Sequence, residues 1–233
     1  MLRQIKDRIR ESLLNETDYG LKNLLSENIL SQYINGYKYL PISNSALDFY
    51  SINMIINDIA INNRKSIIEF GSGVSTIIIA RFLKKEKIVA HIYSVDNNIN
   101  WHNSLIHIIK EEELTEYITF IHAELCVSNI TLNKLLWFNT TIIQDSIGDN
   151  TFDMVIIDGP EAHRQDLALS RYPALPFIYN YLTPNYSIFI DDANRVGEMK
   201  IIEMWGKMYK IQFKKISKTL GVCVNGESFN FIL

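Results

Sequence analysis

The sequence predicts an α/β fold in which helices cover both faces of a mostly parallel sheet. From residue 65 onward, short apolar runs alternate with stretches of helical periodicity, the pattern of strands joined by crossover helices. Near the end, two extended runs flank the short polar turn KTLG, which indicates an antiparallel hairpin. Before residue 65 the apolar residues recur at helical spacing. We therefore expect a sheet domain preceded by a helical segment.

Each strand of the expected sheet is a short apolar run between polar residues. We expect parallel strands at 66–70, 89–95, 117–122, 152–158 and 186–191. The helices are expected at 74–86, 99–113, 162–182 and 195–208, with a weaker connection at 125–150. The hairpin would take residues 209–217 and 221–233. Five parallel strands closed by a hairpin make a Rossmann-like, seven-stranded, mostly parallel sheet, whereas a two-half dinucleotide fold would continue with further parallel units.

The first 64 residues follow a helical pattern. Apolar residues recur at helical spacing near the start of the chain, at Leu2, Ile5, Ile9, Leu13 and Leu14. A second helical stretch runs over 45–59, and the intervening YKYLPISNS reads as a loop. We expect residues 1–64 to form an N-terminal helical cap that closes over the substrate, and 65–233 to form the main domain. The amphipathic first helix could also join two copies into a homodimer.

Composition excludes several classes of function. The 233-residue chain has a formal charge of -3 and a pI of about 6.0, so no basic field gathers nucleic acid. No secretory signal and no run of eighteen apolar residues occurs, so we expect no membrane span. Cys126 and Cys223 are too few and too far apart for a zinc motif or a disulfide framework. We expect reduced thiols and a cytoplasmic protein.

The segment IIEFGSGVST predicts a ligand-binding turn between a strand and a helix. Gly71 and Gly73 allow a tight turn and a close backbone approach to a ligand, with Ser72 and Ser75 beside them. The following helix directs unpaired N–H groups at the turn, where a carboxylate is favoured. The methionine end of S-adenosylmethionine carries such a carboxylate. Glu69 could then meet its ammonium group, directly or through water.

Residues after the next two strands extend this cofactor hypothesis. Asp96 ends the second strand 25 residues beyond Gly71, where a carboxylate can accept both ribose hydroxyls. Asn97 is its neighbour, and Trp101 could pack on the adenine or lie in the core. Ala123 and Glu124, after the third strand, are expected at the adenine edge.

Other interpretations of these residues stay open. Glu69 could pair with a lysine, and Asp96 could cap the following helix. An NAD site is the chemical rival, but Thr76 stands at its third glycine position, and that position favours close strand–helix packing.

Three aspartates follow the fourth and fifth strands. Asp158, Asp191 and Asp192 should converge, because the carboxyl ends of parallel strands face one crevice. Their mutual repulsion calls for a positive charge, which a divalent metal or an arginine could supply. Oxygen ligands suit Mg²⁺, which could lower the pKa of a substrate hydroxyl, with Asp158 and Asp191 as catalytic residues. Alternatively, Asp191 or Asp192 caps the next helix and pairs with Arg195.

Basic residues near the same strand ends have two possible roles. His163 has the side chain best suited to act as a general base at neutral pH, although surface decoration is the commoner role of a histidine. Arg171 and Arg195 could grip a carboxylate or phosphate of the substrate, or could neutralise the aspartates.

The motifs together resemble a known group of enzymes. YLPISNS, EFGSGVST, SVDNNINW, LLWF, IIDGPEAHRQ with RYPALP, and IFIDDANR resemble bacterial class I methyltransferases associated with polysaccharide biosynthesis, over residues 37–200. The two later strand ends are also similar to metal-dependent catechol-type and sugar O-methyltransferases. That similarity implies metal-ligand positions at Asp158, Asp191 and Asp192. The catechol type has asparagine in place of Asp192, and its lysine base has no evident counterpart.

The expected activity is transfer of a methyl group from S-adenosylmethionine to a hydroxyl of a sugar or glycan precursor, with Mg²⁺ or another divalent cation as a candidate assistant. The loop from Tyr37 to Ser45 is expected to form the acceptor wall with Trp137 and Phe138, although Phe138 could simply be buried. A non-catalytic nucleoside-binding scaffold and an NAD-dependent oxidoreductase are the alternatives, because related folds host many chemistries.

Overall fold

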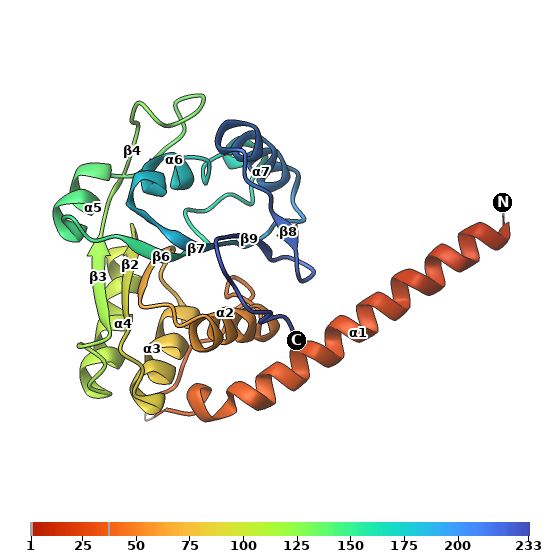
Figure 1. Cartoon of the computed structure of the whole chain (residues 1–233), viewed down its shortest axis with the longest axis horizontal. Coiled ribbons are helices and arrows are strands. Elements are labelled where there is room, and N and C mark those ends of the chain that lie inside the picture. Colours follow the sequence, from red (N-terminus) through yellow and green to blue (C-terminus); the bar gives the residue numbers. More distant parts are fainter. Residues whose placement is uncertain (1, 37) are drawn as a thin grey trace.

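A seven-stranded sheet forms the centre of the computed structural model, which describes residues 2–36 and 38–233 (Figure 1). The strand order is β3-β2-β1-β6-β7-β9-β8. Five strands are parallel: β1 (Ser66–Phe70), β2 (His91–Asp96), β3 (Ile118–His122), β6 (Phe152–Ile157) and β7 (Leu182–Ile190). The hairpin strands β8 (Lys214–Lys215) and β9 (Gly221–Asn225) run antiparallel at the β7 edge. The predicted Rossmann-like sheet and its C-terminal hairpin are confirmed.

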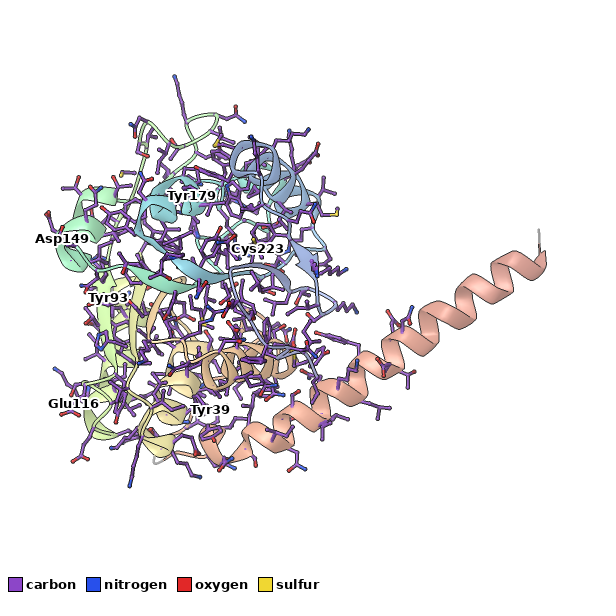
Figure 2. All side chains as sticks on the ribbon, viewed as in Figure 1. Tyr39, Tyr93, Glu116, Asp149, Tyr179 and Cys223 are labelled. Carbon is purple, nitrogen blue, oxygen red and sulfur yellow. The ribbon has the colours of Figure 1, made fainter. Side chains whose placement is uncertain are left out.

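Helices cover both faces of the sheet (Figure 1). One face packs against α2 (Phe49–Ile61), α3 (Val74–Glu86) and α4 (Ile99–Glu111). The other packs against α5 (Thr140–Ile147), α6 (Ala174–Ile178) and α7 (Val196–Tyr209). Side chains fill both layers, and Cys223 of β9 lies within the second one (Figure 2). Burial on both faces explains why the parallel strands are near-continuous apolar runs.

A single helix, α1 (Leu2–Ile34), makes up the first part of the chain. Its C-terminal part packs on the body, where Ser26, Leu30 and Tyr33 are buried, whereas its N-terminal part projects away (Figure 1). The outward side of the packed part exposes four apolar side chains, Leu21, Leu24, Leu25 and Ile29. Within the described residues, no helix has the length and apolar character needed to cross a bilayer.

The helix expected over 162–182 is wrong. The segment forms a 3-10 turn at Gln165–Leu167, the five-residue α6, and a second 3-10 turn at Tyr179–Tyr181. Pro173 and Pro176 explain the interruption, because proline lacks the N–H that a helix interior uses. The weak connection at 125–150 contains a two-stranded hairpin of β4 (Leu125–Cys126) and β5 (Trp137–Phe138), followed by α5.

Candidate active site

A cleft of about 330 Å³ opens at the carboxyl ends of β1, β2 and β6. The loop between α1 and α2 forms its opposite wall. This is the edge at which open parallel sheets bind ligands. The lining residues are Pro41, Ser43, Ser45, Ala46, Leu47, Gly71, Ser72, Gly73, Val74, Ser75, Asp96, Asn97, Trp101, Phe138, Asp158, Gly159, Pro160 and Glu161.

The glycine turn shapes the floor of the cleft. Gly71 has φ +102°, and a Cβ there would lie 2.8 Å from the backbone N of Gly159, so both conformation and packing require glycine. At Gly73 a Cβ would meet only Ser75 Oγ, at 4.0 Å, and would otherwise project into open space. The two glycines therefore do different things: Gly71 brings two strand-end loops together, and Gly73 keeps the cleft open at the start of α3.

Glu69 lies beneath the turn and is fully buried. Its carboxylate accepts hydrogen bonds from Ser75 Oγ at 2.5 Å, from Ser94 Oγ at 2.9 Å and from the Thr76 hydroxyl. Burial raises the pKa of the carboxyl group, and the three hydroxyl donors oppose that rise. The alternative of a lysine pair is wrong, because hydroxyl groups are its partners. Contact between Glu69 and a ligand ammonium group stays a prediction.

Asp96 and Trp101 line the cleft, as expected for residues predicted to meet a nucleoside. Asp96 accepts from the backbone N–H of Ser72 at 3.0 Å and of Asn98 at 2.7 Å, one bond to each carboxylate oxygen. Each oxygen keeps a further lone pair for a ribose hydroxyl. Burial raises the pKa of Asp96. The alternative role of Asp96 as a helix cap is wrong, because Asn98 caps α4. Trp101 lines the cleft and donates its indole N–H to Ser72 O at 2.8 Å.

Residues after β3 contribute less than expected. Ala123 is buried and donates its N–H to Asp96 O at 2.9 Å, and the side chain of Glu124 is exposed. Neither lines the cleft. Phe138 does line it, although the side chain is almost fully buried.

Trp137 does not face the cleft, so its expected place in the acceptor wall is wrong. It is fully buried, with its ring centroid 5.2 Å from that of Phe70 and 5.5 Å from that of Phe177. Of the expected acceptor loop, Pro41, Ser43 and Ser45 line the cleft, whereas Tyr37 lies outside the described residues.

The three aspartates converge as predicted, with one oxygen of each within 4.8 Å of the others. Arg171 lies among them, 4 % exposed. Its guanidinium group donates to Asp192 Oδ2 at 3.1 Å, to Asp158 Oδ1 at 3.3 Å, and to the backbone oxygens of Asp158 at 2.8 Å, Asp191 at 3.3 Å and Pro160 at 3.2 Å. An arginine thus supplies positive charge here, and the substrate-gripping role expected for Arg171 is wrong, because its donors are already engaged.

A fourth buried carboxylate, Glu198, was missed by sequence reasoning. It is fully buried on the first turn of α7, 3.9 Å from Arg171 Nη1. Among the described residues, neither of its oxygens has a hydrogen-bond donor. Arg195 pairs with Asp192 at 2.7 Å and stays partly exposed. Its contact is with the aspartate, and an additional substrate contact stays a prediction.

The carboxylates outnumber the cations in this acidic cluster, defined as Asp158, Asp191, Asp192 and Glu198. Four carboxylates face two guanidinium groups, so the cluster keeps two net negative charges when fully ionised. Burial raises the pKa of Asp158 well above its usual range, and raises those of Asp191 and Glu198. Two protons or one divalent cation would restore neutrality.

His163 lies apart from the cleft lining. Its side chain is 63 % exposed, and Nδ1 lies 3.4 Å from Glu161 Oε1. A catalytic role for His163 stays a prediction. Glu161, at the cleft rim, was not singled out from the sequence, although it is the second residue after the DG pair.

The fold and the cleft define the class of protein. A Rossmann-like sheet with a late antiparallel hairpin, a glycine turn and a carboxylate placed for a ribose is the arrangement of a class I methyltransferase. A family profile described as a methyltransferase domain matches residues 68–193, more than half of the chain. The chain belongs to this methyltransferase-domain family.

Solved structures share the fold. A Klebsiella pneumoniae protein provisionally assigned as an O-methyltransferase superposes with a TM-score of 0.60 at 15% identity, covering 92% of this chain and 100% of that one. The O-methyltransferase from Bacillus cereus in complex with SAH gives 0.55 at 12%, covering 88% and 90%. TomG, an O-methyltransferase from Streptomyces achromogenes in complex with SAM, gives 0.56 at 11%, covering 87% and 90%. A search of curated protein sequences gave no significant match. The family match makes the chain a methyltransferase, and these structures, at 15% identity or less, show the same fold.

Proposed function

We propose that the enzyme methylates a hydroxyl group of a sugar or glycan precursor. The observation that carries the proposal is the composition of the cleft. Asp96, Trp101, Asp158, Ser43 and Ser45 all line this cleft. We assign Asp96 and Trp101 to the nucleoside, and Asp158 with the two serines to the acceptor. A wall of hydroxyl groups and a carboxylate suits a polyhydroxylated acceptor, which needs hydrogen-bond partners at each position.

The cleft residues fit the cofactor at three points. The open space at Gly73 and the N-terminus of α3 accommodate its carboxylate, Asp96 accepts from the ribose hydroxyls, and Trp101 offers an aromatic surface. When bound, S-adenosylmethionine supplies a methyl group activated by its sulfonium. The chain's contribution is to hold the acceptor oxygen in line with the carbon–sulfur bond that breaks, because positioning supplies much of the rate.

Asp158 is the residue we place at the acceptor hydroxyl. As the acceptor oxygen bonds to the methyl carbon, its proton must leave, and the Asp158 carboxylate can accept it. Burial raises the pKa of Asp158, which makes the ionised form a stronger base. Its hydrogen bond from Arg171 at 3.3 Å orients the carboxylate. Asp191 lies farther from the cleft and acts through the electrostatics of the acidic cluster.

A divalent cation fits the acidic cluster. A divalent cation would balance the two net negative charges of the acidic cluster. Asp191 Oδ1 is buried with no hydrogen-bond partner among the described residues. Asp158, Asp191 and Asp192 would hold Mg²⁺, whose charge would lower the pKa of an acceptor hydroxyl. Arg171 pairs with two of these aspartates and so competes with metal binding. Metal dependence therefore needs a measurement of its own.

Two further features complete the proposal. We place the enzyme in the cytoplasm, because Cys126 and Cys223 are free thiols, as is usual in reducing compartments. We also propose a homodimer joined through α1, since its exposed apolar side chains form a patch that a second copy could cover.

Calorimetric titration tests the cofactor and the metal. We expect micromolar binding of S-adenosylmethionine and of its demethylated product, weakened at least tenfold in Asp96→Ala and unchanged in Asp145→Ala, an exposed aspartate of α5. Addition of Mg²⁺ or of EDTA reports the metal, and transfer of labelled methyl to uronates or neutral sugars reports the acceptor. Binding of NAD without either sulfur compound would overturn the assignment, whereas binding without transfer to any hydroxyl would support a scaffold.

A further inference from the structure

A second concave surface lies next to the active site and has no part in the functions described so far. This groove, of about 650 Å³, runs between α1, the start of α2 and the β8–β9 hairpin. We call it the lysine groove; its main lining residues are Tyr19, Lys22, Tyr50, Lys215, Ser217 and Lys218. Its volume lies within the range of small-molecule sites.

Hydrogen bonds through Asp48 and Thr219, which line neither surface, connect the lysine groove to the wall of the cleft. The Tyr19 hydroxyl donates to Asp48 Oδ2 at 2.6 Å, and the Thr219 hydroxyl donates to the same oxygen at 3.3 Å. Thr219 O in turn accepts the N–H of Ala193 at 2.6 Å, directly after the aspartates of β7. Leu47, the residue before Asp48, lines the cofactor cleft. These contacts link the groove to the wall of the cleft and to the end of β7.

The chemistry of the groove differs from that of the cleft. Three lysines line it, against the carboxylates of Glu16 and Asp18, in a chain whose net charge is -3. The ion pairs are long and exposed: Lys218 lies 3.8 Å from Glu16, and Lys22 lies 3.4 Å from Asp18. Such pairs are weak, so the ammonium groups stay available to another anion.

The remaining groups suit a sugar. Tyr19 presents part of its aromatic ring, whereas Tyr50 is buried, and Ser217 and Asn15 offer a hydroxyl and an amide. Lys22 and Lys218 lie over the two tyrosine rings, at 5.7 and 6.0 Å from the centroids, which places cation and ring together. Lys215 is exposed and forms no salt bridge with any residue of the described chain.

We propose that the lysine groove binds an anionic part of the glycan acceptor, a carboxylate or phosphate on a sugar unit next to the one that is methylated. The inference rests on the proposed function, and it specifies that the acceptor is negatively charged. Lys215 and Lys218 attract the anion, and the partly exposed ring of Tyr19 packs against its sugar.

The test compares saccharides of equal size and different charge. Trigalacturonate and neutral maltotriose are titrated calorimetrically into the full chain saturated with the demethylated cofactor, and glucose 6-phosphate reports a phosphate source. We expect trigalacturonate or the sugar phosphate to bind at least tenfold more tightly than its neutral counterpart, maltotriose or glucose, with a preference that falls as salt rises.

Matched charge reversals locate the binding. Lys215→Glu/Lys218→Glu should weaken anion binding roughly tenfold. Lys134→Glu/Lys200→Glu, which changes two exposed lysines elsewhere, should leave it unchanged. Equal binding of charged and neutral sugars, or equal losses in the two double variants, would overturn the inference. Cofactor affinity in the same samples checks folding, and its absence in the wild type would instead count against the methyltransferase assignment.

Discussion

Replacing Arg171 with methionine should destabilise the protein, and more so at high pH. The substitution keeps much of the side-chain volume but removes every donor to Asp158, Asp192 and the backbone oxygens around them. Removing one partner of a buried ion pair typically costs about 3–5 kcal/mol. Because Asp158 retains partial solvent access, we expect a loss of about 3 kcal/mol in the free energy of unfolding at pH 7.

The pH dependence follows from the carboxyl groups left behind. Without Arg171 the pKa values of Asp158, Asp191 and Glu198, already raised by burial, must rise further. The folded state then binds more protons than the unfolded state, so stability falls as pH rises above the unfolded-state values near 4. The loss caused by the variant should therefore be smaller at pH 5 than at pH 8.

Urea denaturation at pH 5, 6.5 and 8 measures this effect. Arg164→Met is the matched control, because Arg164 is exposed and pairs only with Asp166 among the described residues. We expect the control to lose under about 0.5 kcal/mol. Arg171→Lys keeps the charge and should recover part of the stability. A loss in Arg171→Met that is below about 1 kcal/mol, or is equal at all three pH values, would refute the reasoning.

Three further predictions concern the turn, the metal and the dimer. Gly71→Ala should weaken cofactor binding at least tenfold by titration, since φ is +102° and the new Cβ would lie 2.8 Å from Gly159, whereas Gly20→Ala, in open space on α1, should not. If Mg²⁺ binds the acidic cluster, it should release protons from the carboxyl groups. Calorimetry in several buffers detects this release as a binding heat that varies with the ionisation enthalpy of the buffer. Binding without proton release would contradict the raised pKa values. Leu21→Glu should shift sedimentation toward a monomer, and Val89→Glu, at a more exposed apolar position elsewhere, should not; an unchanged distribution in Leu21→Glu would exclude α1 as the dimer contact.

The strands could be predicted because strands that are buried on both faces consist mainly of apolar residues. Each parallel strand contacts helices on both faces, so runs such as 154–157 are apolar throughout. The expected helix at 162–182 failed because its apolar residues fit helical spacing while its prolines do not. The length of α1 was also missed, because its middle has apolar residues on two sides, one packed on the body and one exposed.

The position of the candidate site could be predicted from the sequence, but the ion pairs within it could not. Strand ends placed Asp96 and Asp158 at one edge, and the glycine spacing located the turn between them. The backbone path of residues 160–173 determines which cation pairs with the aspartates. No local sequence pattern predicts that path. An acidic residue is favourable in the first turn of any helix, so Glu198 gives no sequence signal of a special role. Only the three-dimensional fold buries it beside Arg171.

The contact between Gly71 and Gly159 joins two loops that serve different molecules. In the proposed function, one loop receives the methyl donor, and the other carries the carboxylate next to the acceptor. Because a Cβ on either glycine would meet the backbone of the other at 2.8 Å, neither loop can shift outward or gain a side chain without moving its neighbour. Substitutions that change acceptor preference should therefore be tolerated less well at this contact than in the loop at 41–47, which also lines the cleft.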